Sequence, residues 1–358
     1  MKHQINIGEQ KQLLFRADGN STIGAGHIMR CISIADAALE KGVSSVFVTA
    51  DESPCQIIEA HGHESIVLNT DYRRMDREME MFAPAIQNRP LQACIVDSYY
   101  VNQAYFDWLQ KIICCPIVYI DDMAFFPYGC DILINYNIYG TTWEDKYNEL
   151  YEDLKKPQMI LGSGFVPLRR EFRLARRART NQNAQNILVS TGGADPDHFT
   201  LDLLRAIERK GAEKHFDVIV GAMNKDRDII YKQVDRVKNV TLHENVTEMA
   251  RLMLTNDVAI SAAGSTLYEL CATQTPTITY VLEDNQVPGA LAFEKAGVLK
   301  NTGDIRVLGS DRLAEKLISE AVELCDNYQM RLGIVKHQEK VVDGYGALRI
   351  VDELLGAN

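Results

Sequence analysis

A histidine next to two glycines is the part of this sequence best suited to chemistry. His27 follows Gly24 and Gly26 within residues 16–30, which read RADGNSTIGAGHIMR. An imidazole exchanges a proton near neutral pH, so His27 could act as a general base. Asp18 of the same stretch either orients that imidazole or caps a turn. Taken without context, such a histidine is more often structural or a simple hydrogen-bond donor.

The segments on either side would place His27 at the edge of a sheet. Apolar residues 13–15 predict a strand that leads into the stretch, and apolar residues at helical spacing from Ile28 to Leu39 predict a helix that follows it. Open α/β sheets bind ligands at such junctions, outside the carboxyl ends of their strands. A dinucleotide fingerprint needs a third glycine, but Met29 stands at that position. We therefore expect no nicotinamide, flavin or other cofactor.

Two later loops are better suited to bind a phosphate. Residues 190–194 (STGGA) and 261–266 (SAAGST) each follow an apolar strand and precede a helix. Small residues let backbone N–H groups approach an anion, and a helix N-terminus adds positive potential. Glu269, in the first turn of the helix after the second loop, either accepts ribose hydroxyls or complements the helix dipole. The expected phosphate contacts are Gly192, Gly193, Gly264, Ser265 and Thr266.

Composition narrows the class of protein. The chain has 358 residues, which suits two domains, and a formal net charge of −11, which disfavours nucleic acid as a partner. No apolar run approaches the roughly 20 residues of a membrane helix, and the N-terminus has no signal-peptide core, so we expect no membrane span and a cytoplasmic location. The 8 cysteines include no Cys-x-x-Cys pair. Asp121 and Asp122 would point to opposite faces of a strand, so we expect no metal site.

Strand-like and helix-like segments alternate through both halves, which predicts an α/β fold of two Rossmann-like, doubly wound domains. We expect an N-terminal domain at 1–165, a linker region at 166–185 and a C-terminal domain at 186–358, whose last helix, near 346–355, is free to pack on the first domain. Two such domains facing each other would leave a ligand cleft. Predicted strands are 12–16, 44–49, 65–68, 92–97, 116–120, 131–134, 186–190, 215–220, 239–242, 257–261 and 276–280. Predicted helices are 27–40, 54–62, 72–83, 102–112, 197–210, 225–235, 247–254, 265–273, 286–296 and 310–326, with a further arginine-rich helix at 169–179.

The stretch 16–30 is similar to the N-terminal signature of the nucleotide-sugar hydrolases of pseudaminic acid biosynthesis. The similarity continues over most of the chain, at Val96-Asp97-Ser98-Tyr99, Ile120-Asp121-Asp122 and residues 130–137, 164–172, 191–195, 261–269 and 342–350. The second-half motifs also resemble the wider class of two-Rossmann-domain (GT-B) glycosyltransferases, which includes the transferase that forms lipid II.

This resemblance implies an enzyme that releases UDP from UDP-2,4-diacetamido-2,4,6-trideoxy-β-L-altropyranose by inverting attack of water at C1. His27 matches the proposed general base, and we group Asp18 and Tyr99 with it, although Tyr99, like Asn137, either lines the sugar pocket or packs in the core. Glu269 matches a ribose-binding glutamate, and Arg169 matches an arginine near the diphosphate. The other implied substrate contacts are Gly24 and Gly26 near the sugar, Val246 at the uracil, and Asn285 and Gln286 at the sugar.

Two other functions stay open. The first is a true glycosyltransferase of cell-surface or spore-coat polysaccharide, with a sugar or lipid acceptor. Membrane-associated transferases usually carry an apolar or basic patch in the N-terminal domain, whereas residues 50–80 here are mixed and acidic. The second is a UDP-sugar-binding protein without turnover, which would not need His27. The sugar substituents and the oligomeric state are left open as well.

Overall fold

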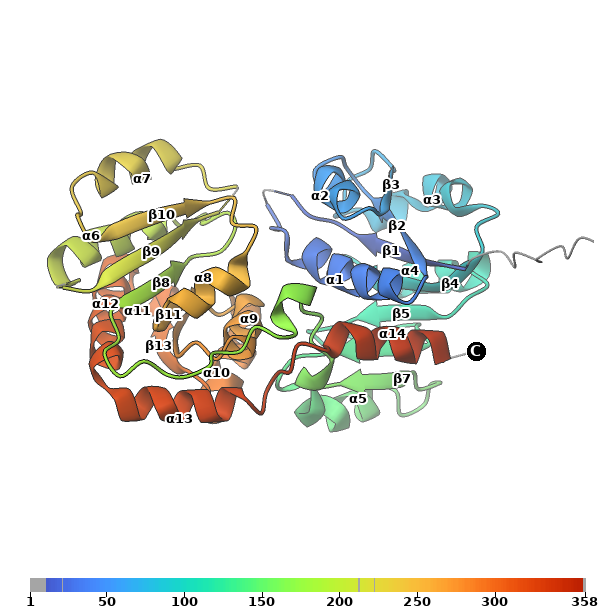
Figure 1. Cartoon of the computed structure of the whole chain (residues 1–358). Coiled ribbons are helices and arrows are strands. Elements are labelled where there is room, and N and C mark those ends of the chain that lie inside the picture. Colours follow the sequence, from blue (N-terminus) through green and yellow to red (C-terminus); the bar gives the residue numbers. More distant parts are fainter. Residues whose placement is uncertain (1–10, 21, 212, 222, 357–358) are drawn as a thin grey trace, which may run out of the picture. The chain divides into compact units, whose positions relative to one another are not determined.

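The computed structural model describes residues 11–20, 22–211, 213–221 and 223–356. Ser21, within the stretch that carries His27, lies outside the described residues. The chain divides into two compact units, and each contains its own sheet (Figure 1). Unit 1 comprises Met1–Arg170 with Tyr345–Asn358, and unit 2 comprises Glu171–Gly344. The domain boundaries expected at 165/166 and 185/186 stay predictions.

Unit 1 is built on a parallel sheet that, over the described residues, has seven strands in the order β3-β2-β1-β4-β5-β6-β7. The inner strands are apolar and buried, because helices cover both faces of a parallel sheet. The strands are β1 (Gln12–Ala17), β2 (Ser44–Thr49), β3 (Glu64–Val67), β4 (Leu91–Asp97), β5 (Ile117–Ile120), β6 (Ile132–Asn135) and β7 (Gln158–Leu161). β7 is a strand that the sequence did not predict.

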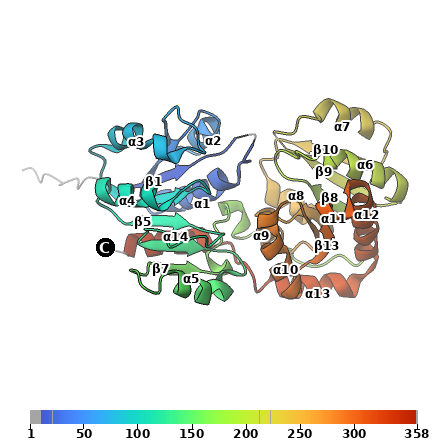
Figure 2. The same ribbon diagram turned by 180° about the vertical axis from the view of Figure 1, so that it is seen from behind.

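Helices pack on both faces of this sheet, as Figures 1 and 2 show from opposite sides. On one face, apolar residues of α3, α4 and α5 form a core with Leu14, Val46 and Val96. On the other face, α1 packs against α14, and Gln92 of β4 donates a hydrogen bond to the Leu354 carbonyl of α14. The helices are α1 (Gly26–Glu40), α2 (Cys55–Ala60), α3 (Met79–Ile86), α4 (Gln103–Ile112), α5 (Glu144–Leu150) and α14 (Gly346–Gly356), with short 3₁₀ turns η1 (Met75–Arg77), η2 (Gly140–Trp143), η3 (Ser163–Phe165) and η4 (Arg170–Phe172).

Unit 2 repeats the plan with a parallel sheet of six strands, over the described residues, in the order β10-β9-β8-β11-β12-β13. α6 and α12 pack together over one face and supply much of its apolar core. The strands are β8 (Asn186–Ser190), β9 (His215–Val220), β10 (Val240–Glu244), β11 (Val258–Ala262), β12 (Thr277–Val281) and β13 (Lys300–Asp304). The helices are α6 (Phe199–Lys210), α7 (Arg227–Val234), α8 (Met249–Thr255), α9 (Thr266–Ala272), α10 (Val287–Lys295), α11 (Ile305–Leu308), α12 (Ser310–Asp326) and α13 (Tyr328–Gln338), with the 3₁₀ turn η5 (Asp284–Gln286).

The two parallel sheets confirm the predicted fold class of two doubly wound α/β units. In each sheet the strand order reverses once, between β1 and β4 in unit 1 and between β8 and β11 in unit 2. Such switch points are where open α/β sheets bind ligands. They are also where the His27 stretch and the two small-residue loops begin.

Some predicted segments were wrong. The arginine-rich helix at 169–179 does not form, and only the short turn η4 lies there. Arg177 explains this locally, because its guanidinium donates to the carbonyl oxygens of Met253, Asn256 and Gln274 and so ties the segment to unit 2. The helix predicted at 72–83 is split into η1 and α3, and β13 and α13 were not predicted.

No helix among the described residues combines the length and the apolar character needed to cross a bilayer.

Candidate active site

The first candidate site lies at the carboxyl edge of the unit 1 sheet. β1 and β4 are neighbours there, with Ala17 of β1 in register with Asp97, the last residue of β4. The chain leaves β1, forms a loop and enters α1, which places His27 in the first turn of that helix. Because the switch point brings these two strand ends together, His27 and Asp97 meet although 70 residues separate them.

His27 and Asp97 form a hydrogen-bonded pair. The imidazole Nδ1 lies 2.7 Å from Asp97 Oδ1, and the His27 side chain is 11% exposed whereas that of Asp97 is fully buried. A carboxylate can only accept a hydrogen bond, so Nδ1 is assigned as the protonated nitrogen. The other ring nitrogen, Nε2, is thereby left as a proton acceptor. This is the tautomer that a histidine general base requires.

Arg30, one turn along α1, binds the same carboxylate. Its Nε donates to Asp97 Oδ2 at 2.5 Å and its Nη2 donates to Oδ1, a bidentate fork. Its Nη1 donates to the Tyr136 hydroxyl at 2.8 Å and to Asp122 Oδ2 at 3.2 Å. Burial by itself would raise the pKa of Asp97, but the charge of Arg30 and the contact with His27 hold that pKa well below its usual range. Asp97 is therefore a charged acceptor in the folded protein.

Tyr99 closes one side of the His27 ring. Its ring meets the imidazole edge to face at a centroid distance of 4.7 Å, and its hydroxyl donates to Asp122 Oδ2 at 3.0 Å. Burial of the hydroxyl, together with the negative charge of Asp122, raises the pKa of Tyr99, so the phenol stays protonated. The ring is 40% exposed, so it is a wall of the site rather than part of the core. The hollow beside His27 is lined by Asp18, Ile23, His27, Tyr72, Asp97, Ser98, Tyr99 and Tyr100.

Asp18 lines the same hollow but both of its oxygens are engaged elsewhere. Oδ2 accepts from Arg16 at 2.6 Å and Oδ1 accepts from the Ala50 backbone N–H at 2.7 Å. Arg16 is fully buried and also forms two hydrogen bonds to Glu78, at 2.8 and 2.6 Å. The structure thus gives Asp18 a role in fixing the loop after β1, and gives the role of holding His27 to Asp97. A signal for Asp97 was present in the sequence, because it is the acidic residue that ends an apolar strand.

The loop between β1 and α1 is tightly folded around Asn20. The Asn20 side-chain carbonyl accepts from the backbone N–H groups of Thr22 and Ile23 at 2.9 and 3.2 Å, and the Asn20 backbone carbonyl accepts from Gly24 N–H at 2.8 Å. Gly24 has a φ of +74°, which favours glycine. Among the described residues, apart from the adjoining chain itself, no atom lies within 4 Å of where a Cβ would stand on Gly24 or Gly26. The backbone before His27 therefore faces open space.

The second candidate site lies at the carboxyl edge of the unit 2 sheet. Ser190, the last residue of β8, is in register with Ser261, the last residue but one of β11, so the loops that follow these strands start side by side. Asp195 caps α6 by accepting from the N–H groups of Phe199 and Thr200, both at 2.9 Å. Gly192 has a φ of +94°, which favours glycine. A Cβ added to Gly192, Gly193 or Gly264 would meet no atom of a described, non-adjacent residue within 4 Å, so this part of both loops offers its backbone to a ligand.

The remaining residues expected to hold UDP reach the same edge of unit 2, because they follow β10, β11 and β12. Glu269 lies half-buried in the first turn of α9, after Ser265 and Thr266. Val246 lies in a hollow that follows β10. Asn285 is exposed on η5, and the Gln286 side chain accepts from the Leu282 backbone N–H at 2.9 Å. Unit 2 therefore brings these residues together.

Arg169 and Asn137 lie in unit 1 and not in this set. Asn137 follows β6, and its side-chain amide and its backbone N–H both donate to Asn135 Oδ1, at 3.0 and 3.1 Å. Arg169 is partly buried just before η4. Both belong to the unit that carries His27.

Neither the acidic residues nor the cysteines form a metal centre in the part of the chain that the structure describes. Asp121 accepts from the Ala124 backbone N–H at 2.9 Å and from the Tyr147 hydroxyl at 2.6 Å, so it caps a loop. Asp122 instead accepts hydrogen bonds from Arg30 and from the Tyr99 hydroxyl. The two neighbouring carboxylates thus serve different networks.

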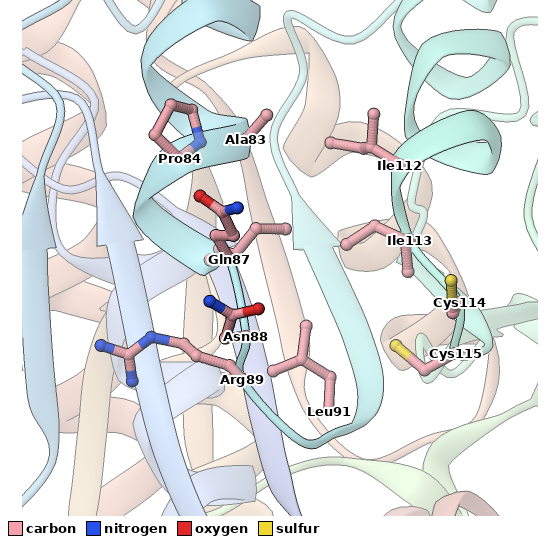
Figure 3. Close-up of a pocket in the computed structure, with 11 residues that line it drawn as sticks. Ala83, Pro84, Gln87, Asn88, Arg89, Leu91, Ile112, Ile113, Cys114 and Cys115 are labelled. Carbon is pink, nitrogen blue, oxygen red and sulfur yellow. The ribbon is translucent and has the colours of Figure 1, made fainter.

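Unit 1 has a wider hollow of about 630 Å³ at the opposite, amino-terminal edge of its sheet (Figure 3). The ends of α3 and α4 and the start of β4 line it. Arg89 is the charged residue of this lining, and its guanidinium binds Glu64 at 2.8 and 2.5 Å. This hollow lies away from the strand ends that carry His27 and contains none of the predicted site residues.

Comparison with known proteins distinguishes unit 2 from unit 1, because a known family matches a range that lies within unit 2. Residues 181–343 match the family described as glycosyltransferase family 28 C-terminal domain. The chain is 24% identical to the spore coat polysaccharide biosynthesis protein SpsG of Bacillus subtilis over 342 residues, which are 93% of this chain and 95% of that protein. It is 25% identical to the UDP-2,4-diacetamido-2,4,6-trideoxy-β-L-altropyranose hydrolase of Campylobacter jejuni over 72% of this chain and 87% of the hydrolase.

Other similarities concern longer proteins and the fold. The chain spans about half the length of two curated relatives that it matches, protein MJ1062 of Methanocaldococcus jannaschii (24% identical) and the Helicobacter pylori protein that combines pseudaminic acid cytidylyltransferase with the same hydrolase (26% identical). Among solved structures, MurG of Acinetobacter baumannii has a TM-score of 0.64 at 11% identity and covers 96% of this chain and 99% of its own. The two-unit fold is thus that of the GT-B glycosyltransferases.

Proposed function

We propose that this chain is a UDP-sugar hydrolase, with UDP-2,4-diacetamido-2,4,6-trideoxy-β-L-altropyranose as substrate and water as acceptor. The observation that carries the proposal is the His27–Asp97 pair at the switch point of unit 1, because it leaves an imidazole nitrogen ready to take a proton. The similarity to the C. jejuni and H. pylori proteins, whose names include this hydrolase, supports the choice of substrate. The similarity to SpsG supports a place in the synthesis of cell-surface sugars.

In the proposed reaction, His27 Nε2 takes a proton from a water molecule as the water oxygen attacks C1 of the sugar. Asp97 keeps the proton on Nδ1 and stabilises the imidazolium that forms, without itself taking a proton. The bond from C1 to the UDP oxygen breaks through an oxocarbenium-like state, and the configuration at C1 inverts. A positioned base of this kind contributes roughly 10²–10⁴-fold to the rate.

The leaving UDP gains negative charge, and unit 2 has the groups to bind it. Backbone N–H groups around Gly192, Gly193 and Gly264 would face the diphosphate, and Glu269 would accept the ribose hydroxyls. We assign Val246 to the uracil, and Asn285 and Gln286 to the sugar. Arg169 is retained as a candidate diphosphate contact from unit 1.

A glycosyltransferase that uses a sugar or lipid acceptor is the second candidate function. It is favoured by the match of residues 181–343 to glycosyltransferase family 28 and by the fold shared with MurG. The two functions differ in the acceptor. A hydrolase turns over UDP-sugar in buffer alone, whereas a transferase needs its acceptor for comparable rates.

The test is a panel of UDP-sugars, including the diacetamido-trideoxy-altropyranose, incubated with the purified full chain and no acceptor. We expect equal amounts of UDP and free reducing sugar from the favoured substrate. His27→Asn should abolish turnover while calorimetric UDP binding stays as in the wild type. Absence of turnover across the panel would refute the hydrolase, and a fully active His27→Asn variant would remove His27 from the mechanism.

A further inference from the structure

A histidine paired with a buried carboxylate has an inherent problem as a base. The negative charge that orients the imidazole also stabilises its protonated form. An imidazolium cannot accept a proton from water, so the carboxylate that fixes the tautomer also favours the form that is inactive as a base. Asp97 is fully buried and lies 2.7 Å from Nδ1, which is the geometry in which this effect is large.

Arg30 supplies the opposite charge at the same carboxylate. Its guanidinium binds both oxygens of Asp97, and its Nη2 lies 3.0 Å from His27 Nδ1. A planar guanidinium fork matches a carboxylate geometrically and keeps its charge at every accessible pH. The imidazole therefore meets a carboxylate whose charge is partly offset by a guanidinium, while the Nδ1–H bond that sets its tautomer is kept.

We infer that Arg30 makes His27 a more readily available proton acceptor by opposing the charge of Asp97 at the imidazole. Arg30 is then a positioning residue that acts through Asp97 and His27, not a group that touches the substrate. This inference rests on the proposed function only in giving His27 the role of base. The effect of Arg30 on the protonation of His27 is a property of the free protein.

The other groups around His27 fit this assignment. Asp122 adds a second carboxylate to the network: it accepts from the Nη1 nitrogen of Arg30 at 3.2 Å and from the Tyr99 hydroxyl at 3.0 Å, so one guanidinium charge offsets two carboxylates in part. Asp18 contacts Arg16, which also binds Glu78. The remaining titratable side chains of the network or the hollow, Cys31, Tyr72, Tyr99, Tyr100 and Tyr136, are neutral when protonated. Among the described residues, Arg30 is accordingly the cation that contacts both Asp97 and Asp122.

The experiment compares Arg30→Gln, which removes the charge, with Arg30→Lys, which keeps it. The imidazole of His27 is titrated by NMR in protein with isotope-labelled histidine, and its signal is assigned by its absence in His27→Asn. The pH dependence of kcat/KM is measured in parallel. Arg89→Gln is the matched control, because it makes the same substitution in the same unit at the guanidinium that binds Glu64.

We expect Arg30→Gln to move the His27 titration, and the acidic limb of the kcat/KM profile, upward by about one to two pH units. At a fixed pH on the acidic limb, activity then falls about 10–100-fold relative to the wild type. Arg30→Lys and Arg89→Gln should titrate as the wild type does. A folded Arg30→Gln protein in which His27 titrates at the wild-type pH would overturn the inference.

Two features keep the test decisive. The NMR titration needs no substrate, so it tests Arg30 even where no UDP-sugar is hydrolysed, which is the outcome that would refute the proposed function instead. If Arg30→Gln does not fold, the double variant Arg30→Gln/Asp97→Asn removes both charges together. In this double variant His27 should titrate near the wild-type pH. A titration displaced upward by a full pH unit would contradict the inference that the charges of Arg30 and Asp97 oppose each other at His27.

Discussion

Replacing Asp97 by Asn tests the geometry of the site with the smallest change of shape. The amide can present either its N–H₂ or its oxygen to His27. If the N–H₂ faces Nδ1, the imidazole must carry its proton on Nε2 and cannot act as a base. If the oxygen faces Nδ1, the N–H₂ is set against the donors of Arg30. Both arrangements remove the proposed function of the pair.

The magnitudes follow from what Asp97 contacts. Loss of an oriented base predicts a fall in kcat of roughly 10²–10⁴-fold, with little change in KM because the Asp97 side chain is fully buried. Loss of one partner of a buried ion pair costs about 3–5 kcal/mol of the free energy of unfolding. Arg30 keeps its bonds to Asp122 and Tyr136, so we expect the lower end of that range, about 3 kcal/mol.

The assay is steady-state release of UDP, with urea unfolding measured on the same preparations. Asp18→Asn is the matched control, since it changes another carboxylate that lines the same hollow. Asp18→Asn should lower the free energy of unfolding, because it weakens the hydrogen bonds that Asp18 accepts from Arg16 and from the Ala50 backbone N–H. It should leave most of kcat intact. The role of Asp97 in orienting His27 is refuted if folded Asp97→Asn keeps the wild-type kcat. It is also refuted if Asp18→Asn loses as much kcat as Asp97→Asn does.

Three further predictions concern stability, nucleotide binding and pH. Glu78→Gln should lower the free energy of unfolding by about 3–5 kcal/mol in urea titrations, because it leaves a fully buried guanidinium short of a charged partner; a loss below about 1 kcal/mol, as at an exposed pair, would contradict this. Glu269→Gln should weaken UDP binding about 10–100-fold by calorimetry, and unchanged affinity would remove it from the ribose site. Burial raises the pKa of Asp36, but hydrogen bonds from His63 and His61 lower it overall. Its stabilisation is thus complete above the unfolded value of about 3.9 and is lost as the pH falls through the lower folded value, so the urea midpoint should fall more below about pH 4 in the wild type than in Asp36→Asn.

Much of the architecture could be predicted because the strands and helices have local patterns of apolar residues in the sequence. A parallel strand buried on both faces is mostly apolar, and β5 and residues 93–96 of β4 show this directly. β13, which the sequence did not predict, lacks such a pattern. β13 reads KNTGD, an edge strand with few apolar residues, and the arginine-rich segment near Arg177 has helix-forming residues but is held by carbonyl groups of unit 2.

The residues of the candidate site could likewise be predicted only in part from the sequence. His27 and the glycine loops could be found because each is a local motif at a strand end. The partner of His27 could not be found locally, because Asp97 reaches it only through the pairing of β1 with β4. Asp18 is the nearer carboxylate in the sequence, but Arg16 and the backbone of Ala50 hold it. Arg30 lies within the recognised stretch, yet its role depends on where Asp97 lies.

Attack of water at C1, with His27 as the base, is tested by the position of an oxygen label in the products. The full chain is incubated with its UDP-sugar in ¹⁸O-labelled water without an acceptor, and both products are analysed by mass spectrometry at early times, with a correction for exchange at the free anomeric carbon. We predict one ¹⁸O atom at C1 of the released sugar and none in UDP, with no labelled product from His27→Asn. Label in the terminal phosphate of UDP would place the cleavage at phosphorus and rule out attack at C1.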